Sequence, residues 1–289
     1  MSITASEFYS LDVSEYDESV ETDFFKGLKM RNGTFKLTGQ SRLIEIEKFL
    51  GSYFVERASN IRAALDVGAS SGITTAEFAY FLRAHGAQAN WTATDPYIRA
   101  HIVNVTPGVR VLCDPDGWPL QYDIGGVAVR PWIRRMDYAT LAFIPRILAR
   151  KVLRRRTKAL IDRGQSKPVQ LISRRLTGRE DVEFVEDDIL KRRSSFAGRF
   201  DLVRAANVLN RNYFSVEHLG LAIGNVHAYL RAPGALFLVT RTNPARQNAG
   251  TLFELTDDRT FSVVDRIGGG SEIEDLVLSY RPRGSGERG

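Results

Sequence analysis

The chain has 289 residues, of which 43% are hydrophobic and 26% are charged, and its formal net charge at pH 7 is +6. This length and composition suffice for a sizeable buried core and exclude a chain that is disordered throughout. The sequence predicts no internal disulfide and no bound metal, because it has one cysteine and four histidines without metal-ligand spacing, namely Cys113, His85, His101, His218 and His227.

The basic residues are concentrated in one segment of the chain. Residues 131–175 hold thirteen Lys and Arg against two Asp, which leaves the rest of the chain with a net charge of about −5. A uniformly basic protein would indicate a nucleic-acid coat, whereas one basic segment on an acidic body indicates a docking element. No run of about 18 apolar residues and no secretion signal is present, so we expect a cytoplasmic protein.

Residues 1–58 are predicted to form an N-terminal helical cap, and residues 59–289 to form the main domain. The cap begins with an acidic stretch, turns at Asn32-Gly33 and continues into a helical pattern of apolar residues over 43–54.

From residue 61 onward, strand and helix patterns alternate. The apolar run Ile61–Val67 predicts a strand, a glycine loop follows at 68–72, and residues 75–82 have a helical pattern. Further strands are predicted at 91–94, 182–185, 200–205 and 235–240, and further helices at 169–176 and 218–230. This alternation predicts an α/β fold with a parallel sheet. At the end of the chain, strands are expected at 260–267 and 275–280, paired antiparallel through the turn at 268–271.

The loop after the first strand carries the most specific motif. Residues 65–73 read Leu-Asp-Val-Gly-Ala-Ser-Ser-Gly-Ile, which resembles motif I of the class I S-adenosylmethionine (SAM)-dependent methyltransferases. The resemblance implies a seven-stranded, mostly parallel sheet that ends in an antiparallel hairpin and has helices on both faces. It also implies SAM as the cofactor, held by the following residues of this loop: Asp66, Gly68, Ala69, Ser70, Gly72 and Thr74.

In this resemblance, the carboxylate of Asp66 holds the ammonium of the methionine moiety, and the two glycines let the backbone approach the ligand closely. Ala69 and Ser70 depart from the family pattern, which usually has a small residue and a glycine there. The main rival, a nicotinamide-binding loop of Gly-x-Gly-x-x-Gly form, fits poorly because Ser70 and Ile73 replace its second and third glycines.

Acidic residues at two further strand ends extend the predicted cofactor site. Asp95, followed by Pro96, ends the second strand about 23 residues after Gly72, where nucleotide-binding α/β proteins place an acid that accepts from the ribose hydroxyls. Residues 184–190 resemble the end of the third strand in this family, where a carboxylate accepts from the adenine amino group. The resemblance implies this role for Asp188, with Asp187 as the alternative, beside Ile189. Ala206 and Asn207, after the fourth strand, complete the predicted contacts.

The acceptor side of the site is less defined by the sequence. Methyl transfer from a sulfonium is an in-line displacement that requires alignment and exclusion of water and no dedicated catalytic residue. If the acceptor must lose a proton, Tyr213 and His218 are the nearest candidate bases, although His218 also fits an ordinary position at a helix start. Asn207 and Asn210 could accept hydrogen bonds from substrate, or could simply form the turn.

A long insertion follows the second strand, at about residues 97–165. The runs 109–113 and 120–124 predict a β-hairpin, and a basic helix follows Pro145. Because loops at the carboxyl ends of strands surround the ligand in this fold, the insertion is expected to shape the acceptor site. For the helix at 146–163 three interpretations remain open: a solvated helix packed by Ile144, Leu148 and Val152, docking to nucleic acid, and docking to an anionic membrane surface as a peripheral protein, which fits better than nucleic acid.

The sequence therefore favours a SAM-dependent methyltransferase whose acceptor is unidentified, with a small molecule, a lipid or a glycan preferred. A second hypothesis is a methyltransferase-like fold without turnover that serves as a binding or scaffold module and docks through the basic helix to nucleic acid, membrane or protein. A nicotinamide dehydrogenase is the third. The oligomeric state stays open.

Overall fold

The computed structural model describes residues 3–12, 18–36, 44–243 and 247–282. The chain divides into two compact units, one formed by residues 1–39 and 97–177 (unit 1) and the other by residues 40–96 and 178–289 (unit 2). This division differs from the boundary predicted at 58/59, because the first part of the predicted cap joins the insertion and its last helix joins the main domain. Residues 13–17 and 37–43 of the cap lie outside the described residues.

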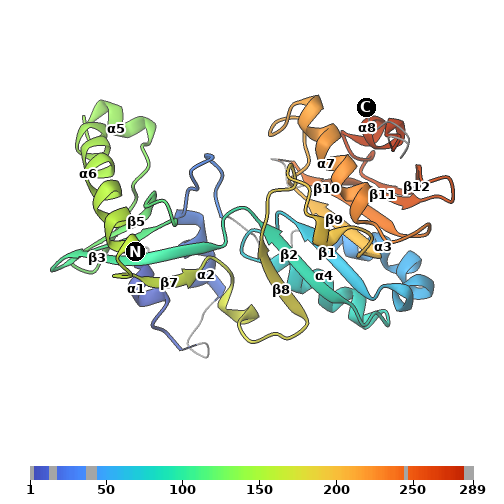
Figure 1. The fold of residues 1–289 in the computed structure, drawn as a ribbon, viewed down its shortest axis with the longest axis horizontal. Helices are drawn as coiled ribbons and strands as arrows, with labels where there is room; N and C mark the ends of the chain where they lie inside the picture. Colours follow the sequence, from blue (N-terminus) through green and yellow to red (C-terminus); the bar gives the residue numbers. More distant parts are fainter. Residues whose placement is uncertain (1–2, 13–17, 37–43, 244–246, 283–289) are drawn as a thin grey trace. The chain divides into compact units, whose positions relative to one another are not determined.

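Unit 2 is built on a seven-stranded sheet (Figure 1). The first five strands in space run parallel in the order β8-β2-β1-β9-β10, the 3-2-1-4-5 order of doubly wound sheets. Two antiparallel strands, β11 and β12, complete the edge. The predicted mixed sheet is confirmed, with strands β1 (Ala63–Val67), β2 (Asn90–Asp95), β8 (Val182–Glu186), β9 (Leu202–Ala206), β10 (Leu236–Thr242), β11 (Asn248–Leu255) and β12 (Phe261–Ile267).

Helices cover both faces of this sheet, because alternate residues of the buried strands point to opposite sides. Leu65, Val203 and Phe237 pack in one apolar cluster with residues of α7 (Val216–Tyr229) and α8 (Glu274–Ser279). Their neighbours in the strands pack in a second cluster with residues of α3 (Ile44–Arg57) and α4 (Ile73–Ala84). The expectation of helices on both faces is therefore confirmed.

The predicted C-terminal hairpin is wrong in its second strand. Residues 274–279 form α8 instead of a strand. The antiparallel partner of β12 is β11, a strand that was not predicted from the sequence. The apolar run in 275–280 alternates like a strand, but Val277 is fully buried and its neighbours Leu276 and Leu278 join the cluster beside α7. Packing against the rest of unit 2 therefore favours a helix in this segment over the strand that the local sequence pattern predicts.

Unit 1 contains a five-stranded antiparallel sheet in the order β6-β5-β4-β3-β7. The predicted hairpin is confirmed as β4 and β5, but three further strands pair with it. The predicted helix at 169–176 is wrong: residues 167–170 pair with β3, and only a 3₁₀ turn (η3, Arg174–Leu176) follows. The strands are β3 (Arg99–Thr106), β4 (Val109–Cys113), β5 (Pro119–Ile124), β6 (Val127–Val129) and β7 (Lys167–Gln170).

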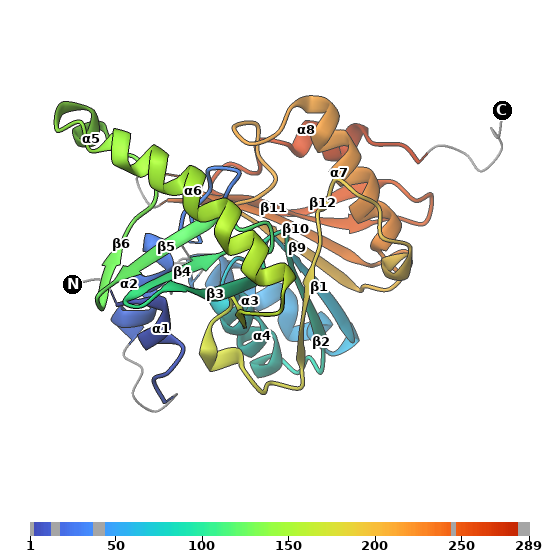
Figure 2. The same ribbon diagram turned by 60° about the vertical axis from the view of Figure 1, so that its left-hand side comes forward.

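The two faces of the unit 1 sheet are covered by segments far apart in the sequence. On one face Ile102 and Leu112 pack with α1 (Ala5–Phe8) and α2 (Glu18–Gly27), where Phe8 stacks on Phe24 with ring centroids 3.8 Å apart. On the other face lies the basic helix α6 (Phe143–Asp162), which crosses over β3 and β5 (Figure 2). The remaining short elements are α5 (Arg135–Ala139), η2 (Ala58–Asn60) and η4 (Ser194–Phe196).

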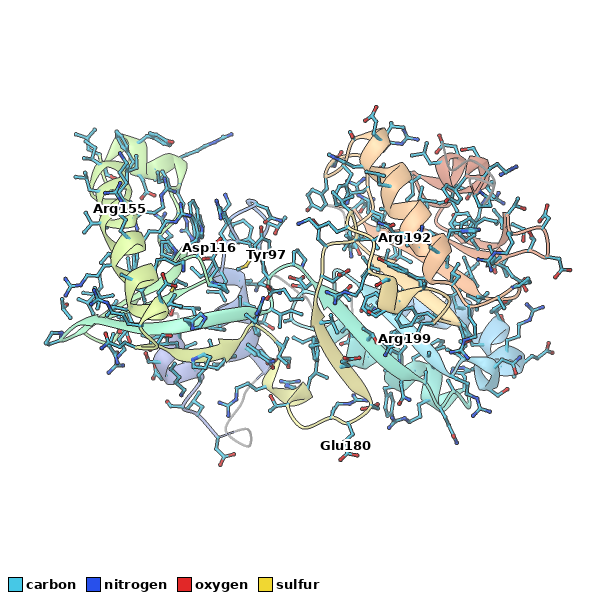
Figure 3. All side chains as sticks on the ribbon, in the orientation of Figure 1. Tyr97, Asp116, Arg155, Glu180, Arg192 and Arg199 are labelled. Carbon is cyan, nitrogen blue, oxygen red and sulfur yellow. The ribbon has the colours of Figure 1, made fainter. Side chains whose placement is uncertain are left out.

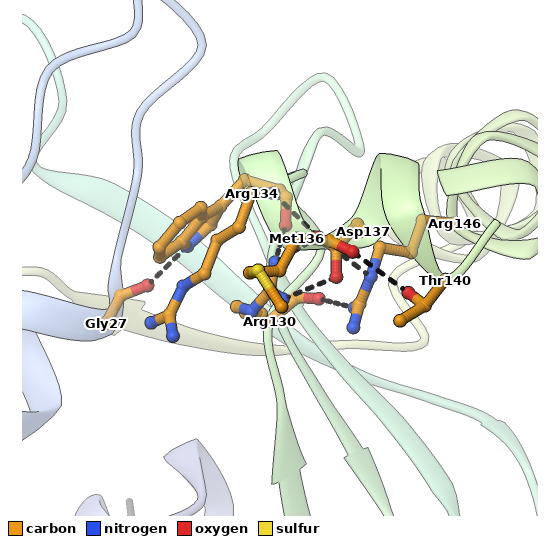
Figure 4. Close-up of polar contacts among 8 residues, drawn as sticks. Gly27, Arg130, Arg134, Met136, Asp137, Thr140 and Arg146 are labelled. Carbon is orange, nitrogen blue, oxygen red and sulfur yellow. Dashed lines mark hydrogen bonds and ion pairs between the residues drawn. The ribbon is translucent and has the colours of Figure 1, made fainter. Parts of the chain in front are cut away.

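An ion-pair cluster fixes the start of α5 against α6 (Figure 4). The Arg130 guanidinium donates to both carboxylate oxygens of Asp137 at 2.7 Å, and the Arg134 backbone N–H donates to Oδ2 at 2.6 Å. Arg146 of α6 lies 3.6 Å from the same oxygen. The hydrogen bonds from Arg130, with those of the Arg134 backbone, hold the pKa of the Asp137 carboxyl well below its usual range.

The structure corrects the expected packing of the basic helix. Ile144, Leu148 and Val152 do not form the buried side of this helix, because these residues are 46%, 58% and 64% exposed. The buried side of α6 is formed instead by Leu153, Leu160 and Ile161, with Thr157 fully buried. Within the described residues, no helix is both long and apolar enough to cross a membrane.

Candidate cofactor site

The loop between β1 and α4 turns through three residues with positive φ. Gly68, Ser70 and Gly72 have φ of 70°, 57° and 81°. Ser70 stands where the family pattern has its second glycine, and it adopts the left-handed conformation that a glycine would take without cost. Gly72 is the N-cap of α4 and, having no side chain, leaves the first N–H groups of the helix without a side-chain cap, which favours an anionic ligand group at this helix end.

Asp66, the acid expected to hold the methionine ammonium, is engaged inside the protein. Its carboxylate Oδ2 accepts hydrogen bonds from the Thr75 hydroxyl (2.6 Å) and from Arg204 Nη1 (2.9 Å). Arg204 lies directly opposite Asp66 in the register of β9 on β1, and both side chains are 2% exposed or less. Burial raises the pKa of Asp66, while the charge of Arg204 and the bond from Thr75 act against this rise.

Arg204 was not predicted from the sequence as a partner of Asp66. Besides Asp66, its Nη1 donates to the Thr74 carbonyl at 3.1 Å, and the guanidinium lies over the Phe78 ring of α4, 5.0 Å from the centroid. The only available signal was an arginine inside an otherwise apolar strand run, since an unpaired charge is rarely tolerated in such a position.

The group that approaches Gly68 closely in this structure is a side chain of the protein, that of Val208. A Cβ on Gly68 would lie 2.2 Å from Cγ2 of Val208, which follows β9. The glycine is therefore required for packing between the loops after β1 and after β9, the two strands between which the strand order reverses. Ligands of open α/β sheets bind at this switch point.

Asp95 lies where the sequence predicted it, at the carboxyl end of β2. Its Oδ2 accepts a hydrogen bond from the Ser70 backbone N–H at 3.0 Å, and its carbonyl accepts from the Asp187 N–H at 3.2 Å. Ala69 donates its backbone N–H to the Thr94 carbonyl at 2.8 Å. The acid, the glycine loop and the end of β8 thus meet at one edge of the sheet, with Pro96 directly after Asp95 in the chain.

At the end of β8 the two candidate adenine ligands differ in their contacts. Asp187 forms an ion pair with Arg193 at 2.7 Å. Among the residues that the structure describes, Asp188 Oδ1 accepts only a local hydrogen bond, from the Leu190 N–H at 3.1 Å. Ile189 is buried, and its carbonyl accepts from the Asn225 amide at 2.7 Å. Asp188 therefore remains the better candidate of the two carboxylates.

The residues after β9 form a tight turn rather than an obvious catalytic set. Asn207 has a positive φ of 62°, and its Oδ1 accepts from the Thr242 N–H at 2.7 Å, just after the half-buried Ala206. Asn210 is buried, and its Oδ1 accepts from the N–H groups of Asn212 and Tyr213, both at 3.1 Å. Both asparagines therefore act as turn formers in this structure.

The two candidate bases are exposed. The Tyr213 side chain is on the surface, and His218 lies in the first turn of α7, where its backbone N–H donates to the capping hydroxyl of Ser215 at 3.3 Å. This geometry agrees with the helix-start interpretation of His218.

Three buried polar atoms close to this edge make no hydrogen bond within the described part of the chain. They are Ser71 Oγ, Arg204 Nη2 and Thr240 Oγ1, and they come from the loop after β1 and from the adjoining strands β9 and β10. A buried polar atom without a partner costs about 1–3 kcal/mol. Polar atoms without a partner beside the glycine loop could form hydrogen bonds with a polar ligand. The site therefore suits a cofactor that carries a carboxylate and hydroxyls, as SAM does.

No protein-family model and no curated protein sequence matches the chain. Among solved structures, the chain is similar to the CMeT domain of the citrinin polyketide synthase (15% identity, 68% of this chain and 34% of that chain, TM-score 0.34). It is also similar to a sugar N-methyltransferase from Streptoalloteichus sp. (12% identity, 69% and 49%, TM-score 0.32).

A third similar structure is a SAM-bound amino pentose methyltransferase of calicheamicin biosynthesis from Micromonospora echinaspora (13% identity, 83% of this chain and 82% of that chain, TM-score 0.36). The chain spans between a third and a half of the length of the first two structures. The solved structures to which the chain is similar thus include methyltransferases, one of them with SAM bound.

Proposed function

We propose that unit 2 binds SAM at the edge of its sheet where the parallel strands end, and that the chain transfers the methyl group of SAM to an acceptor. The acceptor is unidentified, and a small molecule, a lipid or a glycan is preferred. The observation that carries the proposal is the meeting of the glycine loop with Asp95, through the hydrogen bond from the Ser70 N–H. It lies beside the switch point of a 3-2-1-4-5 sheet, where nucleoside ligands bind in this architecture.

In this proposal, different residues bind different chemical groups of SAM. Asp95 accepts from the ribose hydroxyls, and Asp188 accepts from the adenine amino group. The uncapped start of α4 and the unpartnered hydroxyl of Ser71 suit the methionine carboxylate. SAM supplies an activated methyl group on a sulfonium, and the protein contributes alignment and exclusion of water.

Asp66 takes a different role from the one that the resemblance implied. Because its charge is matched by Arg204, it fixes the loop from within and does not act as the sole counter-charge of the methionine ammonium. This departure is also the observation that favours the second candidate function, a binding module without turnover. The two are separated by the formation of S-adenosylhomocysteine (SAH) when SAM is supplied together with small-molecule, lipid or glycan acceptors, since a binding module retains affinity but transfers no methyl group to any of them.

Replacing Asp95 with Asn tests the proposed site. Asn retains an acceptor for the Ser70 N–H but loses the negative charge, so SAH affinity is expected to fall by about 1–3 kcal/mol, or roughly five- to 150-fold. Calorimetric titration of parent and variant with SAH measures this, and titration with NAD tests the nicotinamide alternative. Asp257→Asn, an exposed acid in the turn between β11 and β12, should bind SAH like the parent. Equal SAH affinity of Asp95→Asn and parent would contradict the assignment.

We also propose that α6 contacts an anionic membrane surface. Its exposed apolar stripe (Ile144, Leu148 and Val152) is adjoined by the exposed cations Lys151 and Arg155, and an apolar stripe beside basic residues suits the headgroup region of a bilayer. Each cation near an anionic surface contributes about 1 kcal/mol.

Sedimentation with vesicles tests this contact. The full chain should pellet with vesicles that contain phosphatidylserine and remain in solution with phosphatidylcholine alone, and high salt should reduce the pelleted fraction. Changing Leu148 and Val152 to Ser should lower binding to the anionic vesicles strongly, with the folded state checked by circular dichroism. Pelleting that ignores lipid charge, or that survives the serine changes, would leave α6 as an ordinary solvated helix.

A further inference from the structure

A pocket of about 170 Å³ lies within unit 1, and none of its lining residues is among those proposed for the cofactor. Its walls come from the segment after α2, the turn between β4 and β5, the segment before α5, and α6. Two indole rings, Trp118 and Trp132, line it together with apolar residues, and its cations are Lys29, Arg31 and Arg150. We call it the tryptophan pocket.

The walls of the tryptophan pocket are held in place by contacts of their own. The Trp132 indole N–H donates to the Gly27 carbonyl at 3.1 Å, and the edge of the Phe35 ring meets Trp132 with centroids 5.4 Å apart. On the other wall, the Arg150 guanidinium lies over the Trp118 ring, 5.1 Å from its centroid. A site whose side chains are already ordered loses little conformational entropy when it binds a ligand.

The lining offers donors and lacks acceptor side chains. Lys29 Nζ, the Arg150 guanidinium and the Trp118 indole N–H form no hydrogen bond or ion pair with any residue that the structure describes. Lys29 lies over the Phe35 and Trp132 rings, and Arg150 lies over the Trp118 ring. No Asp or Glu is among the described lining residues. Asp116, at the nearby hairpin turn (Figure 3), pairs with Arg31 at 3.1 Å and so neutralises the third cation.

We propose that the tryptophan pocket binds the phosphate group of a small phosphate ester whose cyclic or planar body packs on the apolar wall formed by Met30, Pro119 and Pro131. Two cations without a carboxylate partner match a phosphomonoester, which carries a charge of about −1.5 to −2 at pH 7. Arginine is suited to the two-oxygen recognition of phosphate, and the indole N–H adds a neutral donor.

Calorimetric titration of the full chain with phenyl phosphate, at constant ionic strength, tests the proposal. Phenyl phosphate should bind, phenol should not, and benzoate, which carries one charge, should bind several-fold more weakly. Binding should also change the tryptophan fluorescence, because Trp118 and Trp132 both line the tryptophan pocket. This titration contains no SAM. Phosphate binding can therefore be absent while the proposed methyltransferase function holds, and it can be present while that function fails.

Two substitutions on α6 give a matched comparison. Arg150→Gln removes a charge that lines the tryptophan pocket and should weaken phenyl phosphate binding about tenfold or more. Arg155→Gln removes the same charge from an exposed position of the same helix (Figure 3) and should change affinity by less than about twofold. Absence of phenyl phosphate binding, equal binding of benzoate, or an equal loss in both variants overturns the proposal, because the last result indicates only non-specific attraction to a basic helix.

Discussion

Replacing Arg204 with Met is expected to lower the free energy of unfolding of unit 2 by about 3–5 kcal/mol, because it leaves the buried carboxylate of Asp66 without its cation. The two groups are 2.9 Å apart and no more than 2% exposed, and in the variant only the Thr75 hydroxyl still donates to that carboxylate. The loss should exceed what the missing methylene contacts cost, since methionine fills much of the arginine volume.

Urea denaturation of parent and variant measures this effect. Arg192→Met, an exposed arginine of the same unit (Figure 3), serves as the control and should change stability by no more than about 0.5 kcal/mol. The double variant Arg204→Met with Asp66→Asn removes both charges and should recover part of the loss. If Arg204→Met were as stable as the parent, the buried ion pair would have no energetic role.

The destabilisation should also depend on pH in a defined direction. Burial already raises the pKa of Asp66, and removal of the Arg204 charge takes away the main opposing influence, so the pKa in the folded variant rises further. A carboxyl with a raised folded-state pKa is destabilising where it is ionised. The stability of the variant should therefore approach that of the parent as the pH falls through the folded-state pKa towards about 3.9, the value in the unfolded chain.

The parallel core of unit 2 was predictable because its strands are short runs of mainly apolar and β-branched residues that alternate with helical patterns. Strand β11 was not predictable in this way, because residues Asn248–Leu255 include Gly250 and several polar residues, a composition that is typical of a loop. Its glycine is needed by the sheet itself: a Cβ on Gly250 would lie 2.5 Å from the Val239 carbonyl of the neighbouring strand. Only the paired structure reveals that requirement.

Unit 1 shows a different reason for failure. The local hairpin β4–β5 was found from its turn residues, but β7 joins β3 from about 60 residues further along the chain, and one face of the sheet is covered by α1 and α2 from the N-terminus. Pairings between such distant segments leave little trace in a local pattern. The same holds for the tryptophan pocket, whose walls come from four separate segments.

In the candidate site, the sequence indicated the position of each acid but not its partner. Asp66, Asp95 and Asp188 lie at or near strand ends, as predicted from the spacing. That Asp66 pairs with Arg204 follows from the register of β9 on β1, which aligns residues 138 positions apart. Register is set by the whole sheet, so a motif of nine residues cannot specify it.

Replacing Gly68 with Ala is expected to lower the free energy of unfolding of unit 2 by about 2–5 kcal/mol. Gly68 has a φ of 70°, which costs an alanine about 1–2 kcal/mol, and the added Cβ would lie 2.2 Å from Val208 Cγ2. Overpacking of this kind costs typically 1–3 kcal/mol. Thermal or urea unfolding measures the loss.

A second change separates packing from ligand binding. Val208→Ala removes both methyl groups that Cβ of Ala at position 68 would meet, so the double variant Gly68→Ala with Val208→Ala should regain the steric part of the loss and retain only the backbone strain and the lost valine contacts. SAH binding then gives the second measurement. If glycine also lets the cofactor approach the loop, the double variant should fold well and still bind SAH at least about tenfold more weakly than Val208→Ala alone, because the Cβ of Ala would hold the ligand away from the backbone. Equal SAH affinity of these two variants would show that Gly68 serves only the contact with Val208, and the cofactor would then have to be held by the loop from Ser70 onward.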